Sequence, residues 1–370
     1  MMHSQRSLLR TRARITFPLV LAVVVAIFGS GVVRASNTAQ VNLVSDVPGL
    51  AMHTDPLIKN AWGLSHGPNT PFWVSDAGTN VSTLYDGTGT QVPLVVQIPG
   101  PRALPSLAIP TGNLFNSTSG FVVSNGVASG PSRFIFATAT GTISGWSPSV
   151  DRTHAIRVVD NFPAASYTGI ALGTVGTSTL LYAANFGQGR IDVFDSAFMP
   201  TMLAGTFSDP NLPADFAPFN IENIGGMMYV TYALRGANGR DVAGVGNGYV
   251  DVFTTDGMLV RRFASGGLLN SPWGMAIAPS TFEKFAGDLL VGNFGDGRIN
   301  AFRLSDGKFR GQLKMQGKTI VIPGLWALVT GDGALNANPS AVYFTAGINH
   351  EADGLFGYLS AATEDEGDDS

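Results

Sequence analysis

The polar residues with the types and spacing to do chemistry follow, or interrupt, short apolar runs of the sequence. Asp76, Asn185 and Asn293 each come directly after such a run, and Glu222 stands inside one. Carboxylate and amide oxygens are the ligands that Ca²⁺ takes, in sets of six to eight. A carboxylate buried without a partner is costly, so Glu222 calls for an explanation. One hypothesis is therefore a Ca²⁺ site formed by Glu222, Asn185 and Asn293.

A structural role competes with this hypothesis for most of these residues. Asn185 and Asn293 stand in Asn-Phe-Gly-x-Gly stretches, which are typical of turns because an Asn side chain can bond its own backbone two residues on. Asp76 precedes Ala-Gly-Thr-Asn and has the same alternative. We favour the turn role for these three residues. For Glu222 a structural role and a role in a central channel both stay open.

Three further residues are candidates for ligand binding. Asn223 follows Glu222, and the pair His350 and Glu351 follows a later apolar run, where it could also form a solvated hairpin loop. The chain has no cysteine, which excludes disulfides, thiolate metal sites and cysteine nucleophiles. The histidines lack the spacing of a zinc site, and no Gly-x-Ser-x-Gly nucleophile elbow occurs in a fitting context.

A repeat places these candidates at corresponding positions. The clearest unit, Ser271–Phe302, has three short apolar runs separated by Gly-rich turns, and Asp296-Gly297 is a hairpin signal. Related units recur about every 52 residues, with a weaker copy beginning near Pro110. Six units of about four strands each predict an all-β, six-bladed β-propeller over residues 36–360. Val41–Val44 reads as a strand that could join the last blade and close the ring.

The two ends of the chain predict export and an acidic tail. Four Arg lie between Arg6 and Arg14, an apolar run follows, and Ala35 ends a stretch suited to cleavage. Residues 1–35 are therefore predicted to be a signal peptide, with an uncleaved membrane anchor as the alternative. Residues 361–370 are expected to be a disordered acidic tail. The mature protein would be secreted, periplasmic or extracellular, without a membrane span.

Charge narrows the class of partner. The chain carries 22 Lys and Arg against 26 Asp and Glu, and five of the Arg lie in residues 1–35. The propeller itself is therefore acidic, which disfavours binding to nucleic acid. We expect a monomer whose partner is a protein, a glycan or a small molecule.

Several stretches together resemble the NHL-type repeat, and more specifically a family of uncharacterised, mostly bacterial secreted propeller proteins. Some members of that family end in a PEP-CTERM sorting tail, which this chain lacks. The resemblance implies a fold and export and brings no known activity. The stretches that carry it are NAWGLS (60–65), GTISGW (141–146), NFGQGRIDVF (185–194), APFN (217–220), LLVGNFGDGRINAF (289–302), GLWAL (324–328) and YFTAGINHEADGLFG (343–357).

Two functions of different classes follow. The first is an exported, non-catalytic propeller with a binding or scaffold role in the cell envelope or outside the cell, since no convincing catalytic set is found. The alternative is a Ca²⁺-dependent hydrolase of the lactonase or arylesterase kind, with the metal in the central channel. Whether the protein is an enzyme stays open at this point.

Overall fold

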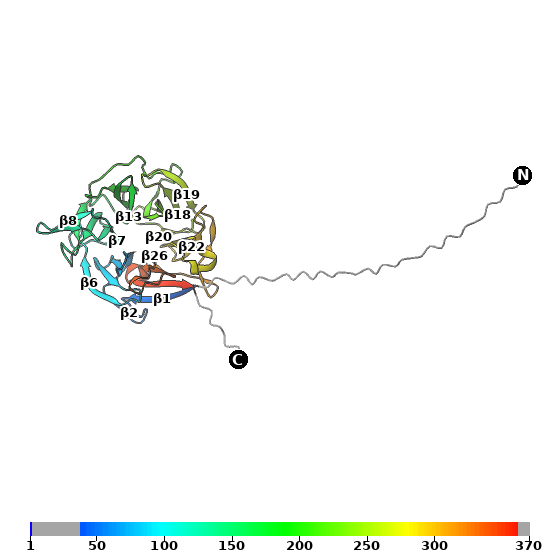
Figure 1. The fold of residues 1–370 in the computed structure, drawn as a ribbon, viewed down its shortest axis with the longest axis horizontal. Coiled ribbons are helices and arrows are strands. Elements are labelled where there is room, and N and C mark those ends of the chain that lie inside the picture. Colours follow the sequence, from blue (N-terminus) through cyan, green and yellow to red (C-terminus); the bar gives the residue numbers. More distant parts are fainter. Residues whose placement is uncertain (2–37, 362–370) are drawn as a thin grey trace. The chain divides into compact units, whose positions relative to one another are not determined.

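The computed structural model describes residues 38–361 and Met1. The predicted signal peptide and nearly all of the predicted acidic tail lie outside the described residues. Within them, short strands form sheets around a central axis, with β7, β13, β20 and β26 near the centre and β1, β6 and β19 at the periphery (Figure 1). The predicted six-bladed β-propeller is confirmed, and its last strand extends to Ala361.

The blades follow one another along the chain. Blade 1 contains β3 (Ala61–Ser65), β4 (Phe72–Asp76), β5 (Val81–Tyr85) and β6 (Gln91–Gln97). Blade 2 contains β7 (Pro110–Phe115), β10 (Phe134–Thr138), β11 (Thr142–Trp146) and β12 (Ile156–Asp160), with an added hairpin of β8 (Val122–Ser124) and β9 (Ser129–Pro131). Blade 3 contains β13 (Tyr167–Val175), β14 (Ser178–Asn185) and β15 (Arg190–Phe194). Blade 4 contains β16 (Phe216–Ile224), β17 (Met227–Leu234), β18 (Gly248–Phe253) and β19 (Leu259–Ser265).

The last two blades complete the ring. Blade 5 contains β20 (Pro272–Ile277), β21 (Leu289–Asn293), β22 (Ile299–Phe302) and β23 (Phe309–Gln312). Blade 6 contains β26 (Leu325–Thr330), β27 (Ala341–Ala346), β28 (Leu355–Ala361), β1 (Thr38–Ser45) and β2 (His53–Thr54). The remaining elements are a small hairpin of β24 (Lys314–Met315) and β25 (Lys318–Thr319), the 3-10 helices η1 (Ser280–Phe285) and η2 (Ala334–Asn336), and the short helix α1 (Ile348–Glu351). Blade 3 departs from the expected four strands, because its sheet has three.

The N-terminal strand closes the ring. β1 pairs antiparallel with β28, so that Val41 lies opposite Tyr358 and Val44 opposite Phe356. The Ser45 hydroxyl also donates to the carbonyl of Gly354, at 2.7 Å. The expected addition of Val41–Val44 to the last blade is therefore confirmed, and blade 6 joins the two ends of the described chain.

Small residues let the innermost strands approach each other at the axis. A Cβ on Gly63 would lie 2.2 Å from the carbonyl oxygen of Thr111, and one on Gly274 would lie 2.3 Å from that of Trp326. Such distances leave no room for a side chain. The repeated glycine of the sequence therefore marks the point where neighbouring blades cross most closely.

An aromatic cluster, which comprises Trp62, Trp273, Trp326, Phe219 and Phe294, fills the axis beside these crossings. Trp62 and Trp326 stack with ring centroids 3.6 Å apart, and Phe294 stacks on Trp326 at 3.8 Å. The three tryptophans are at most 7% exposed. Their recurrence at the starts of innermost strands is thus explained by packing between blades. No helix within residues 38–361 is long and apolar enough to cross a membrane.

Candidate functional site: a cavity at the axis

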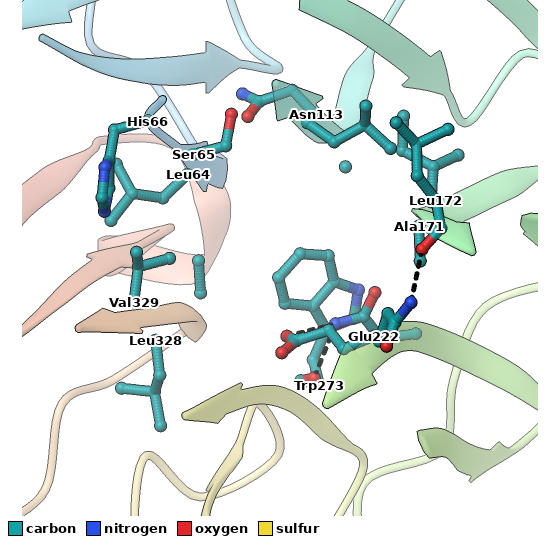
Figure 2. Close-up of a pocket in the computed structure, with 16 residues that line it drawn as sticks. Leu64, Ser65, His66, Asn113, Ala171, Leu172, Glu222, Trp273, Leu328 and Val329 are labelled. Carbon is teal, nitrogen blue, oxygen red and sulfur yellow. Dashed lines mark hydrogen bonds between the residues drawn. The ribbon is translucent and has the colours of Figure 1, made fainter. Parts of the chain in front are cut away.

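A cavity of about 290 Å³ opens beside the aromatic cluster, bordered by the innermost strands of all six blades. Trp273 belongs to both the cluster and the cavity wall (Figure 2). The cavity lies toward the carboxyl ends of these strands, because it takes Ser65 from the end of β3 and Val329 from near the end of β26. Its apolar wall includes Leu64, Leu114, Ile170, Leu172, Leu328 and Val329.

Glu222 is the acidic residue of the cavity lining. The side chain comes from β16, is half-buried, and lies next to Trp273 in Figure 2. Burial raises the pKa of Glu222 to about 8, and hydrogen bonds from the backbone of Met275 and the side chain of Asn220 partly oppose that rise. Desolvation penalises the charged form most where no cation balances it. The lining contains neither Lys nor Arg, so the carboxyl group has no cationic partner there.

Two buried amide side chains flank the cavity. Asn220 donates from Nδ2 to the carbonyl of Trp273 at 2.9 Å and to Oε1 of Glu222 at 3.3 Å. Asn113 donates from Nδ2 to the carbonyl of Trp73 at 3.1 Å and to the Ser75 hydroxyl at 2.9 Å. Because a carbonyl can only accept, the Trp73 contact fixes the orientation of the Asn113 amide. Oδ1 of Asn113 is then buried without a hydrogen-bond partner.

Ser65 and His66, although adjacent, do not form a nucleophile and base. His66 places Nε2 3.1 Å from the carbonyl of Thr330, and Nδ1 3.2 Å from the carboxylate of Asp332. Both ring nitrogens therefore face oxygens at the end of blade 6. The Ser65 hydroxyl is buried without a hydrogen-bond partner. No hydrogen bond joins His66 to Ser65, and Nδ1 of His66 has no hydrogen-bond partner, which argues against a Ser–His pair of the kind used in acyl transfer.

Asn223, the candidate next to Glu222, lies at the exposed rim of the cavity. It donates from Nδ2 to the carbonyl of Leu172 at 2.9 Å, and its Oδ1 accepts from the backbone of Gly226 at 3.0 Å. The side chain therefore links blade 3 to the turn between β16 and β17. It borders the cavity with its hydrogen-bonding groups already engaged.

Asn185 does not reach the cavity. Its Oδ1 accepts from the backbone of Ser166 at 3.2 Å and of Gln188 at 3.1 Å, and its Nδ2 donates to Asp192 at 2.8 Å. The amide is fully buried and holds the turn after β14 against the start of blade 3. The turn role favoured from the sequence accounts for all of these contacts.

Asn293 has the same role in blade 5. Its Oδ1 accepts from the backbone of Asn270 at 3.2 Å, while Nδ2 donates to the carbonyl of Leu268 at 2.8 Å and to Asp296 at 3.0 Å. Neither Asn185 nor Asn293 lines the cavity that holds Glu222. The structure thus does not bring together the three residues of the hypothesised Ca²⁺ site. Within residues 38–361, no three His, Asp or Glu side chains are grouped as a metal site.

Asp76 is fully buried inside blade 1 and does not line the cavity. Its Oδ2 accepts from the backbone of Thr83 at 3.0 Å and from the Thr83 hydroxyl at 2.8 Å, while Oδ1 has no partner. Burial raises the pKa of Asp76 well above its usual value. The residue ties β4 to β5, which is a structural role.

His350 and Glu351 lie at the other end of the axis, beyond the aromatic cluster. They border a separate pocket of about 560 Å³ together with Phe294 and Gly324, which precedes β26. Glu351 accepts from Nδ2 of Asn60 at 3.0 Å and forms an ion pair with Arg240. These two candidates are therefore separate from Glu222 and do not complete its site.

Comparison with known proteins places the chain in a family. No family model matches the sequence. The chain is 35% identical over 334 residues to the uncharacterized protein R648 of Acanthamoeba polyphaga mimivirus, covering 88% of this chain and 81% of that protein. It is 36% identical to the uncharacterized protein L690 of the same virus, covering 88% and 87%. The chain belongs to the family of these mimivirus proteins.

R648 and L690 are both viral proteins, so they give no support to the expected bacterial family or to a sorting tail. Among solved structures, a streptogramin B lyase superposes with a TM-score of 0.52 and 11% identity, covering 88% of this chain and 97% of that one. A likeness at this level of identity shows the propeller fold alone.

The sequence did not single out every polar residue that borders the cavity of this family member. Asn113, Asn220 and Ser65 were missed, although all three stand on innermost strands. Asn220 occupies the place of the glycines at the strand crossings, since a Cβ on Gly169 would lie 2.0 Å from its Oδ1. An alignment of the innermost strands on these glycines shows each of these residues as a polar residue at a position that is mostly apolar or Gly in the other blades.

Proposed function

We propose that the protein is an exported, non-catalytic β-propeller that binds a small molecule in the cavity at the axis. The observation that carries the proposal is the pairing of a largely apolar cavity wall with a single half-buried acid, Glu222. Pockets for small molecules commonly combine apolar walls with a few polar groups that fix the orientation of the ligand. A protein or glycan would need a broader surface than this cavity offers.

The geometry favours binding over hydrolysis. A Ca²⁺-dependent lactonase or arylesterase would need an ion with six to eight oxygen ligands, and Glu222 supplies the only carboxylate of the lining. His66, the one histidine of the lining, is engaged by Thr330 and Asp332. Glu222 itself is what keeps hydrolysis as the second candidate function.

Export is supported by the composition of residues 1–35, with a basic start, an apolar run and small residues before Ser36. The protein would then act in the periplasm, on the cell surface or outside the cell. Expression of the full chain in a secreting host, followed by N-terminal sequencing of the released protein, tests this part. A mature terminus near Ser36 is expected, whereas retention of the full chain inside the cell contradicts export.

A thermal-shift screen of small molecules tests the binding function, because a ligand that binds only the native state raises its melting temperature. The matched control is Val329→Phe, which fills the cavity from its partly buried wall. Hits should stabilise the wild type and lose their effect in this variant. If no compound depends on Val329, the proposed binding site is wrong.

The same assay separates the two candidate functions. Wild type and Glu222→Gln are melted with Ca²⁺ and with EDTA. The binding proposal expects no difference between the two additives in either protein. A Ca²⁺-dependent rise that is lost in Glu222→Gln, together with hydrolysis of an aryl ester, would favour the hydrolase instead.

A further inference from the structure

The amide and indole donors of the cavity side chains are already used by the protein. Nδ2 of Asn113 donates to the carbonyl of Trp73 and to the Ser75 hydroxyl. Nδ2 of Asn220 donates to the carbonyl of Trp273 and to the carboxyl group of Glu222. Nδ2 of the rim residue Asn223 donates to the backbone carbonyl of Leu172. The indole Nε1 of Trp273 likewise donates to a backbone carbonyl. The amide and indole N–H groups beside this cavity are therefore not free to bind a ligand.

Two buried side-chain oxygens beside the cavity lack hydrogen-bond partners. Oδ1 of Asn113, whose side chain belongs to a residue only 8% exposed, has no hydrogen-bond partner, and neither has Oγ of Ser65. In Figure 2 these two side chains point toward one another on one side of the cavity, and Glu222 lies on the opposite side. A buried acceptor without a partner loses free energy that a donor on a ligand would restore.

We infer that the ligand is a small organic ammonium ion with an apolar body, whose ammonium group binds Glu222 and whose other end donates a hydrogen bond to Asn113 and Ser65. This inference rests on the proposed function, because it names the ligand of the same cavity. An ammonium group brings donors and no acceptor, which suits a carboxylate and the oxygens beside this cavity that lack a partner. The indole of Trp273 beside Glu222 adds an aromatic surface that suits a cation.

Other classes of ligand fit the cavity less well. An anion would meet a carboxyl group with no Lys or Arg in the lining to balance it. A bare metal ion would leave the apolar walls, such as Leu328 and Ile170, without contacts, and it would find a single carboxylate, that of Glu222, in the lining. An apolar molecule without donors would leave Oδ1 of Asn113 without a partner.

Binding of an ammonium ion should release a proton. The pKa of Glu222 is raised to about 8 by burial, so the group is largely protonated near neutral pH. A cation bound against it favours the charged form and lowers that pKa. Proton release therefore accompanies binding in the wild type and is absent when residue 222 cannot ionise.

Isothermal titration calorimetry on the propeller tests the inference with four probes of one chain length: n-butylamine, aminobutanol, n-butanol and butyrate. We expect n-butylamine to bind about tenfold or more tightly than n-butanol, because charge-assisted hydrogen bonds are the stronger ones. Glu222→Gln should remove that preference. Titration near pH 7 in two buffers of different ionisation enthalpy should show proton release in the wild type and none in Glu222→Gln.

The second donor is tested by comparing aminobutanol with n-butylamine. Aminobutanol should bind more tightly to the wild type, and Asn113→Leu should abolish that advantage while keeping the preference for amines. Ser65→Ala, which disturbs the fold less, provides the same comparison if Asn113→Leu does not fold. Equal affinity of aminobutanol and n-butylamine for the wild type would overturn the assignment of the second ligand donor to Asn113 and Ser65.

The failure of this inference can be told apart from the failure of the proposed function. If neutral or anionic compounds bind as tightly as the amines, and Val329→Phe abolishes their binding, the ammonium assignment is overturned and the cavity is still a binding site. If no compound of any charge depends on Val329, the proposed function itself is overturned. Unchanged amine affinity in Glu222→Gln also overturns the inference.

Discussion

The indole Nε1 of Trp273 donates to the backbone carbonyl of Thr168, 3.0 Å away, and so links blade 5 to blade 3. The two blades are not neighbours in the ring, so this bond passes close to the axis. Trp273 also meets Trp326 edge to face with centroids 6.0 Å apart, and it forms part of the cavity wall. One side chain thus holds the ring together and shapes the candidate site.

Replacing Trp273 with Phe should destabilise the protein more than replacing Trp62 with Phe. Both changes reduce packing in the aromatic cluster, and only the first leaves a buried carbonyl, that of Thr168, without its donor. Nε1 of Trp62 has no hydrogen-bond partner to lose. We expect a difference of about 1–3 kcal/mol in the free energy of unfolding, measured by urea denaturation followed by circular dichroism. Equal losses in the two variants would show that the bond to Thr168 contributes nothing.

Removal of β1 should sharply lower the melting temperature. Residues 38–45 supply a strand of blade 6 and the contact between Ser45 and Gly354. Their deletion exposes the edge of β28 and the apolar surface under Val44, which is fully buried. We expect a drop of about 10 °C or more in differential scanning calorimetry. The conservative control Gln40→Ala, on the half-buried part of the same strand, should change little. An unchanged melting temperature after deletion contradicts closure by β1.

The stability of the propeller should depend on Glu222 between about pH 4.5 and pH 8. Burial raises the pKa of Glu222 in the folded protein to about 8, from 4.5. The folded state then binds the proton more tightly than the unfolded state does. The contribution of Glu222 to the free energy of unfolding is therefore fully present below pH 4.5 and is lost as the pH rises toward 8. Glu222→Gln should remove this slope and be more stable than the wild type at pH 8.

Other buried acids also have raised pKa values, so the comparison must be made between variants. Burial raises the pKa of Asp251 to about 7 even though Arg262 opposes the shift, and the pKa of Asp76 is also raised. Both contribute the same sign of pH dependence to wild type and variant alike. The measurement is the difference between wild type and Glu222→Gln in melting temperature at pH 5 and pH 8. A difference that does not change with pH would contradict the raised pKa.

The sequence sufficed for the fold because the propeller repeats its chemistry. Glycines at the strand crossings, such as Gly63 and Gly274, and the tryptophans beside them recur at a fixed spacing, so six blades and their closure by β1 could be predicted. The missing fourth strand of blade 3 could not, because β15 is followed by a segment with no periodic pattern of its own. The repeat pattern predicts the features that the blades share, and it does not predict the features in which one blade differs from the others.

The site was predictable only in part, for the same reason. Glu222 stood out because it breaks an apolar strand, and the structure places it in the cavity. The unpaired Oδ1 of Asn113 depends on which carbonyl its amide reaches in the neighbouring blade, a contact that no local pattern encodes. His350 and Glu351 also broke the pattern, yet they lie beyond the aromatic cluster. A residue that departs from the repeat is a candidate site residue, but the pattern does not show which of these residues lie together in the folded protein.

Asn293 and Glu222 should respond in opposite ways to substitution if the first is structural and the second binds ligand. Asn293→Ala removes a fully buried amide that donates to the carbonyl of Leu268 and accepts from the backbone of Asn270. We expect a loss of about 1–3 kcal/mol in the free energy of unfolding, with amine affinity unchanged in calorimetry. Glu222→Gln should weaken amine binding without lowering stability at pH 8, because it removes a carboxyl group whose ionisation is unfavourable in the folded protein. Loss of ligand affinity in Asn293→Ala would show that Asn293 contributes to ligand binding and would contradict a purely structural role in the turn.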